Sequence, residues 1–444
     1  MNETWEEGTL RTFYEDHLKR VLLPFWLRSA DEEYGGFFNC YDNTGECLVS
    51  TDKYTWSQGR FVWMYAKLAS LSTDTFDTDE RDRFLRLAER GAKFLMDHSV
   101  LENGNCAFVL NRAGEPKLNP PNERYDSSIF ADCFVVAGLA KYAAVSGDFV
   151  SLDFSRTLYR SIVRRIENGS YEMVPYPTPS GYRSHNIPMI LLNVTQELLE
   201  AEEALGAAEW ETGDDGSNRA EWLRGSMKAF LLEIMDHFVD ADGVLNEMIR
   251  TDYSRADTLL GRYCNPGHSI EDMWFVIHAA VKLGMEDYVG RAVRTVKKMV
   301  ELGWDDEYGG LLLFVDRDGG QPRGSRNGLE HEAMVGQIEQ NWDNKLWWVH
   351  SEALYTTMLG YSLTGDERML ADYRSIHDYT FRTFPHPDER IGEWIQIRRR
   401  SGEPIDKVVA LPVKDPYHII RNVVLIIELL DRMKNSPGTR GLPR

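Results

Sequence analysis

Apolar residues recur at helical spacing in one stretch of this chain after another, and this periodicity limits the fold more than any other feature. Residues 60–72, 128–143, 187–205 and 271–284 each carry apolar side chains at intervals of three and four. Strand-like alternation is rare and brief. We therefore predict an all-α protein, with short β-hairpin excursions in the connecting loops.

Several of the expected helices are apolar around most of their circumference, notably those at 187–199 and 418–430. Such helices must be shielded by others, whereas an amphipathic helix such as 81–99 fits an outer layer. About a dozen helices in two concentric rings is the simplest arrangement. The prediction is an (α/α)6 barrel, or toroid, in which residues 1–434 form a single domain and residues 435–444 form a flexible tail.

Two glycine-containing connections nearly repeat each other. They read DEEYGGFF at residues 31–38 and DDEYGGLL at residues 305–312. This repetition indicates a duplicated helix-hairpin unit with a small β-excursion at one end. No linker rich in Pro, Gly or Ser divides the chain, which also favours a single domain.

Composition excludes several classes of partner. The formal net charge is −20, so nucleic acids and anionic membrane surfaces are repelled on average. No segment approaches the unbroken apolar length needed to span a bilayer, and we expect no membrane association. The five cysteines show no CxxC spacing, which argues against a disulfide framework and fits a reducing cytoplasm.

Cofactor and metal motifs are absent from the sequence. The histidines never occur as HxxxH or HxH, and we expect no metal site. Phosphate loops, GxGxxG turns and nucleophile elbows are missing too. The pattern favours acid–base chemistry that requires no cofactor.

Two histidines fall in the first turns of expected buried helices. His268 follows Pro266 in NPGHSIEDMWFVI, and His418 follows Pro416 in KDPYHIIRNVV; proline suits the first helical turn. The positive end of a helix dipole disfavours imidazolium, so this placement predicts neutral histidines that act as bases near neutral pH. A histidine at a helix start is more often a cap or a surface residue, so spacing alone does not assign this role.

Other polar residues share helix faces with these histidines. Glu271 follows His268 by three residues, Trp274 follows Glu271 by three, and Arg421 stands in the same relation to His418. Side chains three or four apart lie on one face of a helix and can reach the same cavity. The structural alternative is that Trp274 is a core residue and that Glu271 only favours the helix dipole.

A third expected helix offers a surface suited to a sugar. Trp348 and Glu352 are four residues apart in KLWWVHSEALYTTMLGY, which pairs a stacking ring with a hydrogen-bonding carboxylate. Tryptophans at such spacing are ordinarily core residues. Arg60 is less ordinary, because it lies among apolar residues in WSQGRFVWMYAKL and needs an ionic partner or a ligand.

Eight segments in order, from about residue 30 to residue 430, together resemble the N-acylglucosamine 2-epimerase family, whose mammalian members are also called renin-binding proteins. They are KYTWSQGRFVWMYAKL, SSIFADCFVVAGLA, IPMILLNVTQEL, NPGHSIEDMWFVI, GWDDEYGGLLLFVD, KLWWVHSEALYTTMLGYSLTGD, GEWIQIRRRSGE and KDPYHIIRNVV. The resemblance implies an (α/α)6 barrel whose inner helices line a sugar-binding funnel, and an isomerase that acts as a carbohydrate epimerase.

The resemblance also implies roles for individual residues. His268 and His418 match the two acid–base histidines of the family. The matching substrate-binding positions are Arg60, Arg183, Glu271, Trp274, Trp348, Glu352 and Arg421. Of these, Arg183 in YRSHNIPM stands where such epimerases can have lysine.

The branch of the family is inferred from one helix. Cellobiose 2-epimerases and the isomerases of mannose or sulfoquinovose resemble this chain, but they typically add a histidine on the helix that here reads IPMILLN. Its absence favours N-acetylglucosamine and N-acetylmannosamine as the substrate pair, interconverted by two-histidine proton transfer at C2 of the open-chain sugar. The family further implies a cytoplasmic homodimer that needs no cofactor, with ATP as an allosteric effector in some members.

Three alternatives stay open from the sequence. The first is isomerisation of an aldose to a ketose, or 2-epimerisation of unsubstituted hexoses or cellobiose. The second is an (α/α)6 glycoside hydrolase in which Glu271 and Glu352 flank the scissile bond. The third is a sugar-binding or protein-interaction module, against which two histidines at helix starts argue, because binding alone does not require two neutral bases.

Overall fold

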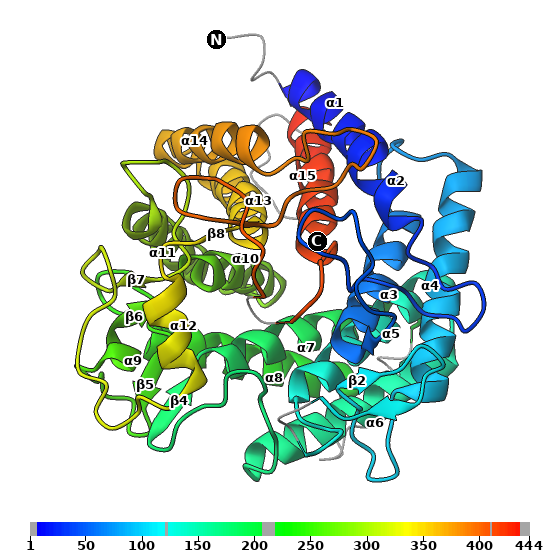
Figure 1. The fold of residues 1–444 in the computed structure, drawn as a ribbon, viewed down its shortest axis with the longest axis horizontal. Helices are drawn as coiled ribbons and strands as arrows, with labels where there is room; N and C mark the ends of the chain where they lie inside the picture. The colour runs from blue at the N-terminus through cyan, green and yellow to red at the C-terminus, as the bar shows by residue number, and fades with distance from the viewer. Residues whose placement is uncertain (1–6, 120–122, 207–217, 409–410, 436–444) are drawn as a thin grey trace.

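The helices of this protein form two concentric rings (Figure 1). The structure, a computed structural model, describes residues 7–119, 123–206, 218–408 and 411–435. Each inner helix contacts the next inner helix along the chain, and α15 contacts α3 and so closes the ring. The inner helices are α3 (Thr55–Ala69), α5 (Ile129–Ser146), α7 (Asn186–Ala204), α10 (Pro266–Lys282), α13 (Trp347–Thr364) and α15 (Tyr417–Asn435).

An outer helix covers each inner one. Five of the outer helices pack on the inner helix that precedes them, whereas α1 packs on α15 and joins the two ends of the described chain (Figure 1). The outer helices are α4 (Thr78–His98), α6 (Phe149–Glu167), α8 (Arg219–Glu233), α11 (Glu286–Gly303), α14 (Glu367–Thr383) and α1 (Glu7–His17). The predicted (α/α)6 barrel is confirmed.

Sequence pattern sorts the helices into these two layers. The outer helix α4 is amphipathic, and a capping box formed by Asp77 and Glu80 starts it. The inner helix α5 is apolar on every side and is, among the described residues, the one helix long and apolar enough to cross a membrane. The prediction that no segment reaches that length was therefore wrong, but 78% of this apolar window is buried inside the barrel, as in the core helix of a soluble protein.

Short antiparallel strand pairs lie at the end of the barrel where the inner helices begin. In the part of the chain that the structure describes, they form one three-stranded and three two-stranded sheets, so the predicted β-excursions are present. The strands are β1 (Lys53–Tyr54), β2 (Val109–Leu110), β3 (Pro116–Lys117), β4 (Tyr182–Ser184), β5 (Met248–Arg250), β6 (Tyr263–Cys264), β7 (Val315–Asp316), β8 (Lys345–Leu346) and β9 (Ile397–Arg398). In the β4–β5 pair, Ser184 lies opposite Met248.

The two similar glycine-containing connections have equivalent structures. Asp31 accepts a hydrogen bond from the buried Lys53 Nζ at 3.0 Å, and Asp305 accepts one from Lys345 Nζ at 3.0 Å. Each lysine precedes an inner helix and each aspartate begins a bridged turn. In both copies of the duplicated segment, an aspartate–lysine ion pair therefore connects the loop to the start of an inner helix.

Shorter elements fill the remaining connections. They are the π-helical turns η2 (Leu18–Leu22) and η4 (Ile234–Phe238), and the short helices α2 (Leu23–Trp26), α9 (Leu259–Arg262) and α12 (Ala333–Asn341). The predicted tail at 435–444 lies outside the described residues apart from Asn435, which ends α15.

Candidate active site

A cavity of about 250 Å³ lies at the end of the barrel where the inner helices begin. Its wall contains residues from the first turns of all six inner helices, together with Met334 and Gln337 of α12. Much of this wall is aromatic or apolar, including Trp56, Phe130, Phe134, Met173, Tyr176, Phe275 and Trp347. The charged lining residues are Arg60, Glu247, His268, Glu271, Asp415, His418 and Arg421.

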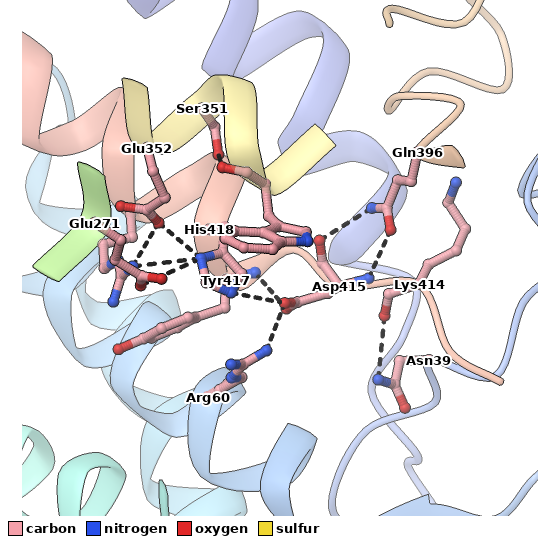
Figure 2. A network of polar contacts seen from close by, with 12 residues as sticks. Asn39, Arg60, Glu271, Ser351, Glu352, Gln396, Lys414, Asp415, Tyr417 and His418 are labelled. Atoms are coloured by element: carbon pink, nitrogen blue, oxygen red, sulfur yellow. Dashed lines mark hydrogen bonds and ion pairs between the residues drawn. The ribbon is translucent and has the colours of Figure 1, made fainter. Parts of the chain in front are cut away.

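His418 is held by carboxylates at the start of α15 (Figure 2). Its Nδ1 lies 2.7 Å from Glu352 Oε1, so the Nδ1–H donates to that carboxylate. The other ring nitrogen, Nε2, lies 3.6 Å from Asp415 Oδ2. This orientation fixes the tautomer and leaves Nε2 as the nitrogen that can take a proton from a bound molecule.

Arg421 lies one helical turn beyond His418 and joins two carboxylates. Its guanidinium donates to Glu271 and to Glu352, and it is almost completely buried. Burial alone would raise the pKa of Glu352, but Arg421 and His418 outweigh burial and lower it. Trp274 Nε1 also donates to Glu352 at 2.9 Å. This carboxylate is therefore charged and accepts hydrogen bonds from three side chains.

His268 lies in the first turn of α10. The side chain of Asn265 caps this helix by accepting from the His268 backbone N–H at 3.2 Å. The ring Nδ1 lies 3.3 Å from Glu247 Oε2. Burial would lower the pKa of His268, but Glu247 reverses the shift and the pKa is raised. The shift is therefore opposite to the one expected from the helix start, because the nearby carboxylate has the larger effect.

Trp348 lies beside both histidines. Its ring centroid is 5.1 Å from that of His268 and 5.7 Å from that of His418. All three side chains line the same cavity. Two ionisable rings, each paired with a carboxylate, therefore line one cavity from different helices.

Arg60 has the ionic partner that its apolar surroundings require. Its Nη1 donates to Asp415 Oδ2 at 2.6 Å (Figure 2), and its guanidinium lies over the rings of Phe134 and Tyr417 at 4.2 and 5.1 Å. Burial lowers the pKa of Arg60, and Asp415 opposes this effect. Asp415 thus links Arg60 to His418 in the cavity wall.

The structure separates the expected sugar-binding residues into three groups. Arg60, Glu271, Trp348 and Arg421 line the cavity with the two histidines. Trp274 and Glu352 do not line it. Glu352 instead accepts from His418, Arg421 and Trp274 behind the wall. Arg183 is also outside the cavity wall.

Strand geometry explains the position of Arg183. Its neighbours in β4, Tyr182 and Ser184, are buried, and alternate residues of a strand point to opposite faces. The guanidinium of Arg183 pairs with Glu233 and lies 4.7 Å from the Tyr253 ring centroid. It therefore takes part in a partly exposed cluster and does not face the site.

Two acidic residues of the site were not identified from the sequence. Glu247 comes from the loop before β5, and Asp415 precedes α15, where its Oδ1 accepts from the Tyr417 N–H at 2.9 Å. The motif KDPY contained the signal for a helix cap at Asp415. Glu247 had no such signal, because only the tertiary fold brings its loop to His268.

A cluster with the spacing of a cation site has a different explanation here. Among the described residues, Glu271, Glu352 and His418 offer ligand atoms within 4.8 Å of one another. The Arg421 guanidinium already donates to both carboxylates. The positive charge that this cluster requires is therefore supplied by the protein itself.

Comparison with known proteins identifies the family. Residues 36–422 match the model of the family described as N-acylglucosamine 2-epimerase (GlcNAc 2-epimerase). The chain belongs to this family. It is 31% identical over 440 residues to the N-acylglucosamine 2-epimerase of Bos taurus. This alignment covers 96% of this chain and 93% of the bovine protein. The predicted class, a carbohydrate epimerase, is confirmed at the level of the family.

Solved structures of epimerases and isomerases share the fold. The cellobiose 2-epimerase from Bacillus thermoamylovorans B4167 superposes with a TM-score of 0.72 and 19% identity, over 95% of this chain and 99% of that one. A D-mannose isomerase superposes with a TM-score of 0.69 and 16% identity, over 94% and 97% of the two chains. At these identities the likeness shows the barrel and does not assign a substrate.

Proposed function

We propose that this member of the family interconverts N-acetylglucosamine and N-acetylmannosamine by moving a proton at C2, without a cofactor. The observation that carries the proposal is that His268 and His418 line one cavity, both beside Trp348 and each paired with a carboxylate. Inversion at a carbon requires a proton donor on one face and an acceptor on the other. The bovine relative, named for N-acylglucosamine, supports the choice of sugar.

The reaction begins with the open-chain aldehyde form of the sugar. One histidine removes the proton from C2, and the C–H electron pair moves into a C1–C2 double bond while the C1 oxygen becomes an oxyanion. The other histidine then returns a proton to C2 on the opposite face. His418 is assigned as the base that removes the C2 proton of the gluco epimer. His268 is assigned as the base that removes the C2 proton of the manno epimer.

Fixed positive charge stabilises the intermediate. The developing oxyanion needs donors that are already in place, because reorienting donors during the reaction raises the barrier. Arg60 and Arg421 both line the cavity and are held by carboxylates. Arg60 is the first candidate for this contact and Arg421 is the second.

Proton NMR in deuterated water tests the proposed function. The purified protein is incubated with N-acetylmannosamine and, in parallel, with mannose and with cellobiose. The expected result is N-acetylglucosamine that carries deuterium at C2. Fructose formed from mannose, with no reaction of the acetylated sugar, would contradict the proposal and assign the protein to ketose formation.

Variants of a single histidine test which epimer each histidine deprotonates. In His418→Asn, His268 still removes the C2 proton of N-acetylmannosamine, so this sugar should take up deuterium while epimerisation falls by about 10³-fold. His268→Asn should give the mirror result, with exchange into N-acetylglucosamine. Full epimerisation by either variant would refute the two-histidine mechanism.

A further inference from the structure

A buried chain of ionisable groups contacts His268 through Glu247. Glu247 contacts His268 through Oε2, and its Oε1 lies 3.9 Å from Nδ1 of His185. The other ring nitrogen of His185, Nε2, lies 2.8 Å from Asp272 Oδ2. Asp272 follows His268 by four residues on α10, so the chain of contacts begins and ends on the same helix.

Backbone pairing brings these groups together. The His185 N–H donates to the Glu247 carbonyl oxygen at 2.9 Å, which extends the β4–β5 pairing by one step beyond Ser184 and Met248. His185 also immediately precedes α7. A strand pair and two inner helices therefore fix the positions of His185, Glu247 and Asp272.

Packing alone does not account for these side chains. His185 and Asp272 are fully buried and Glu247 is 1% exposed. Burying two carboxylates and an imidazole is costly, and apolar residues of similar volume would usually pack at lower cost. Among the described residues, His185 Nδ1, Glu247 Oε1 and Asp272 Oδ1 also have no hydrogen-bond partner, so the contact between His185 and Glu247 is electrostatic and is not a hydrogen bond.

We propose that His185 and Asp272 are positioning residues that hold Glu247 in place and, through Glu247, set how strongly His268 retains a proton. Asp272 accepts from His185 Nε2–H, and this bond orients the ring so that Nδ1 lies 3.9 Å from Glu247 Oε1, close enough for an electrostatic contact but too long for a hydrogen bond. The arrangement resembles a chain of acid and base in which each member fixes the next. This inference rests on the proposed function, because it concerns the same proton-transfer site.

The proposal has a consequence for pH dependence. The groups that act on His268 are Glu247 from the loop before β5 and both Glu271 and Asp272 from α10, while Trp348 of α13 packs on the ring. The three carboxylates each favour the imidazolium. Removing the charge of Asp272 also frees His185 to turn away from Glu247. Both effects shift the titration of His268 to lower pH.

Two variants and two measurements test this inference. Asp272→Asn removes the charge with little change of shape, and His185→Gln removes the ring but keeps an amide donor. Titration of the His268 Cε1–H signal by NMR, assigned with His268→Asn, should move to lower pH by about half a unit or more in both variants. The acid limb of kcat/KM against pH should move with it, and kcat should fall by about tenfold while KM changes little.

Glu202→Gln is the matched control. Glu202 is also fully buried on α7, but it pairs with Arg156 and lies outside the cavity wall. This variant should lose stability without moving the His268 titration. A general effect of placing an amide in the core would instead move the titration in all three variants and would overturn the proposal.

An unchanged His268 titration in folded Asp272→Asn and His185→Gln would likewise overturn it and leave the two residues a packing role. If Asp272→Asn does not fold, His185→Gln decides the question. Failure of the proposed function gives a different result, namely no deuterium in any sugar with the unaltered protein. The NMR titration needs no substrate and still decides whether the chain acts on His268.

Discussion

Glu352 lies behind the cavity wall and connects three of the residues that build the site. It accepts from His418, Arg421 and Trp274. We expect Glu352→Gln to lower kcat by about 10²-fold, because a neutral amide holds neither the His418 tautomer nor the Arg421 charge. Steady-state kinetics with the epimerised sugar measures this effect.

Glu428→Gln is the control for that substitution. Glu428 is a second buried acid on the inner ring, where it accepts from Lys67 and Ser72 far along α15 from His418. This variant should reduce stability and leave kcat unchanged. Equal loss of kcat in both variants would show that Glu352 acts through stability alone.

Two of the three predicted arginines, Arg60 and Arg183, should differ sharply in effect. Arg60 lines the cavity and Arg183 pairs with Glu233 outside it. We expect Arg60→Met to lower kcat/KM by about 10²-fold through loss of an oxyanion donor, whereas Arg183→Met should leave kcat/KM unchanged. A large loss in Arg183→Met would mean that this side chain reaches the sugar.

What the sequence could predict at this scale depended on where a residue is held. Helical spacing indicated which face a side chain occupies. His268, Trp348 and Arg421 line the cavity, whereas Trp274 and Glu352, inferred from the same spacing, lie behind its wall. Glu247 lies on a loop whose position depends on contacts distant in sequence. The sequence alone gave no means of pairing it with His268.

At the scale of elements, the duplicated connections make the start of α13 dependent on one buried ion pair. Asp305 and Lys345 are nearly inaccessible to solvent, and Arg400 also donates to Asp305 at 2.9 Å. Burial would raise the pKa of Asp305, but Arg400 and Lys345 lower it to about 2. The carboxylate is therefore charged at neutral pH and balances the lysine.

We expect Asp305→Ala to destabilise the protein by about 3–5 kcal/mol, because it leaves the Lys345 ammonium buried without its carboxylate. Urea unfolding followed by circular dichroism measures the free energy. Asp306→Ala changes the adjacent exposed aspartate and should have little effect. Similar midpoints for the two variants would show that the buried pair does not fasten the loop to α13.

Helix starts were the elements most accurately predicted, and the strands were the least. Proline marked the beginning of α10 at Pro266 and lay directly before α15 at Pro416, because a missing N–H costs nothing in the first turn. The strands are two or three residues long. Periodicity cannot identify strands this short, and the outward position of Arg183 followed from one of them.

For the whole molecule, burial of neutral histidines couples folding to pH. Burial lowers the pKa of His17, His278 and His350 to about 3 and that of His377 to about 4. Some of these rings accept hydrogen bonds that protonation would abolish. His350 Nε2, for example, accepts from the Leu311 backbone N–H at 2.9 Å.

The sign of this coupling follows from the two states of each ring. Between pH 6.5 and about 3 the unfolded chain binds protons that the folded chain does not, so stability is present above pH 6.5 and is lost as the pH falls. Each histidine contributes a slope of up to about 1.4 kcal/mol per pH unit. Several groups act in the opposite direction, including Asp132, whose pKa burial raises to about 6, and His268, whose pKa is also raised, so they offset part of the loss from the four rings.

We therefore expect the free energy of unfolding to fall by several kcal/mol between pH 7.5 and pH 5.5, measured by urea titration at constant ionic strength. Acidification also brings the net charge of −20 closer to zero and so weakens the repulsion within the folded chain, which favours folding. The loss of stability from the histidines would have to exceed this gain in stability. His331→Gln alters a histidine that is 76% exposed and should leave the pH dependence unchanged. Constant or rising stability down to pH 5.5 would mean that the four rings accept protons without unfolding the barrel.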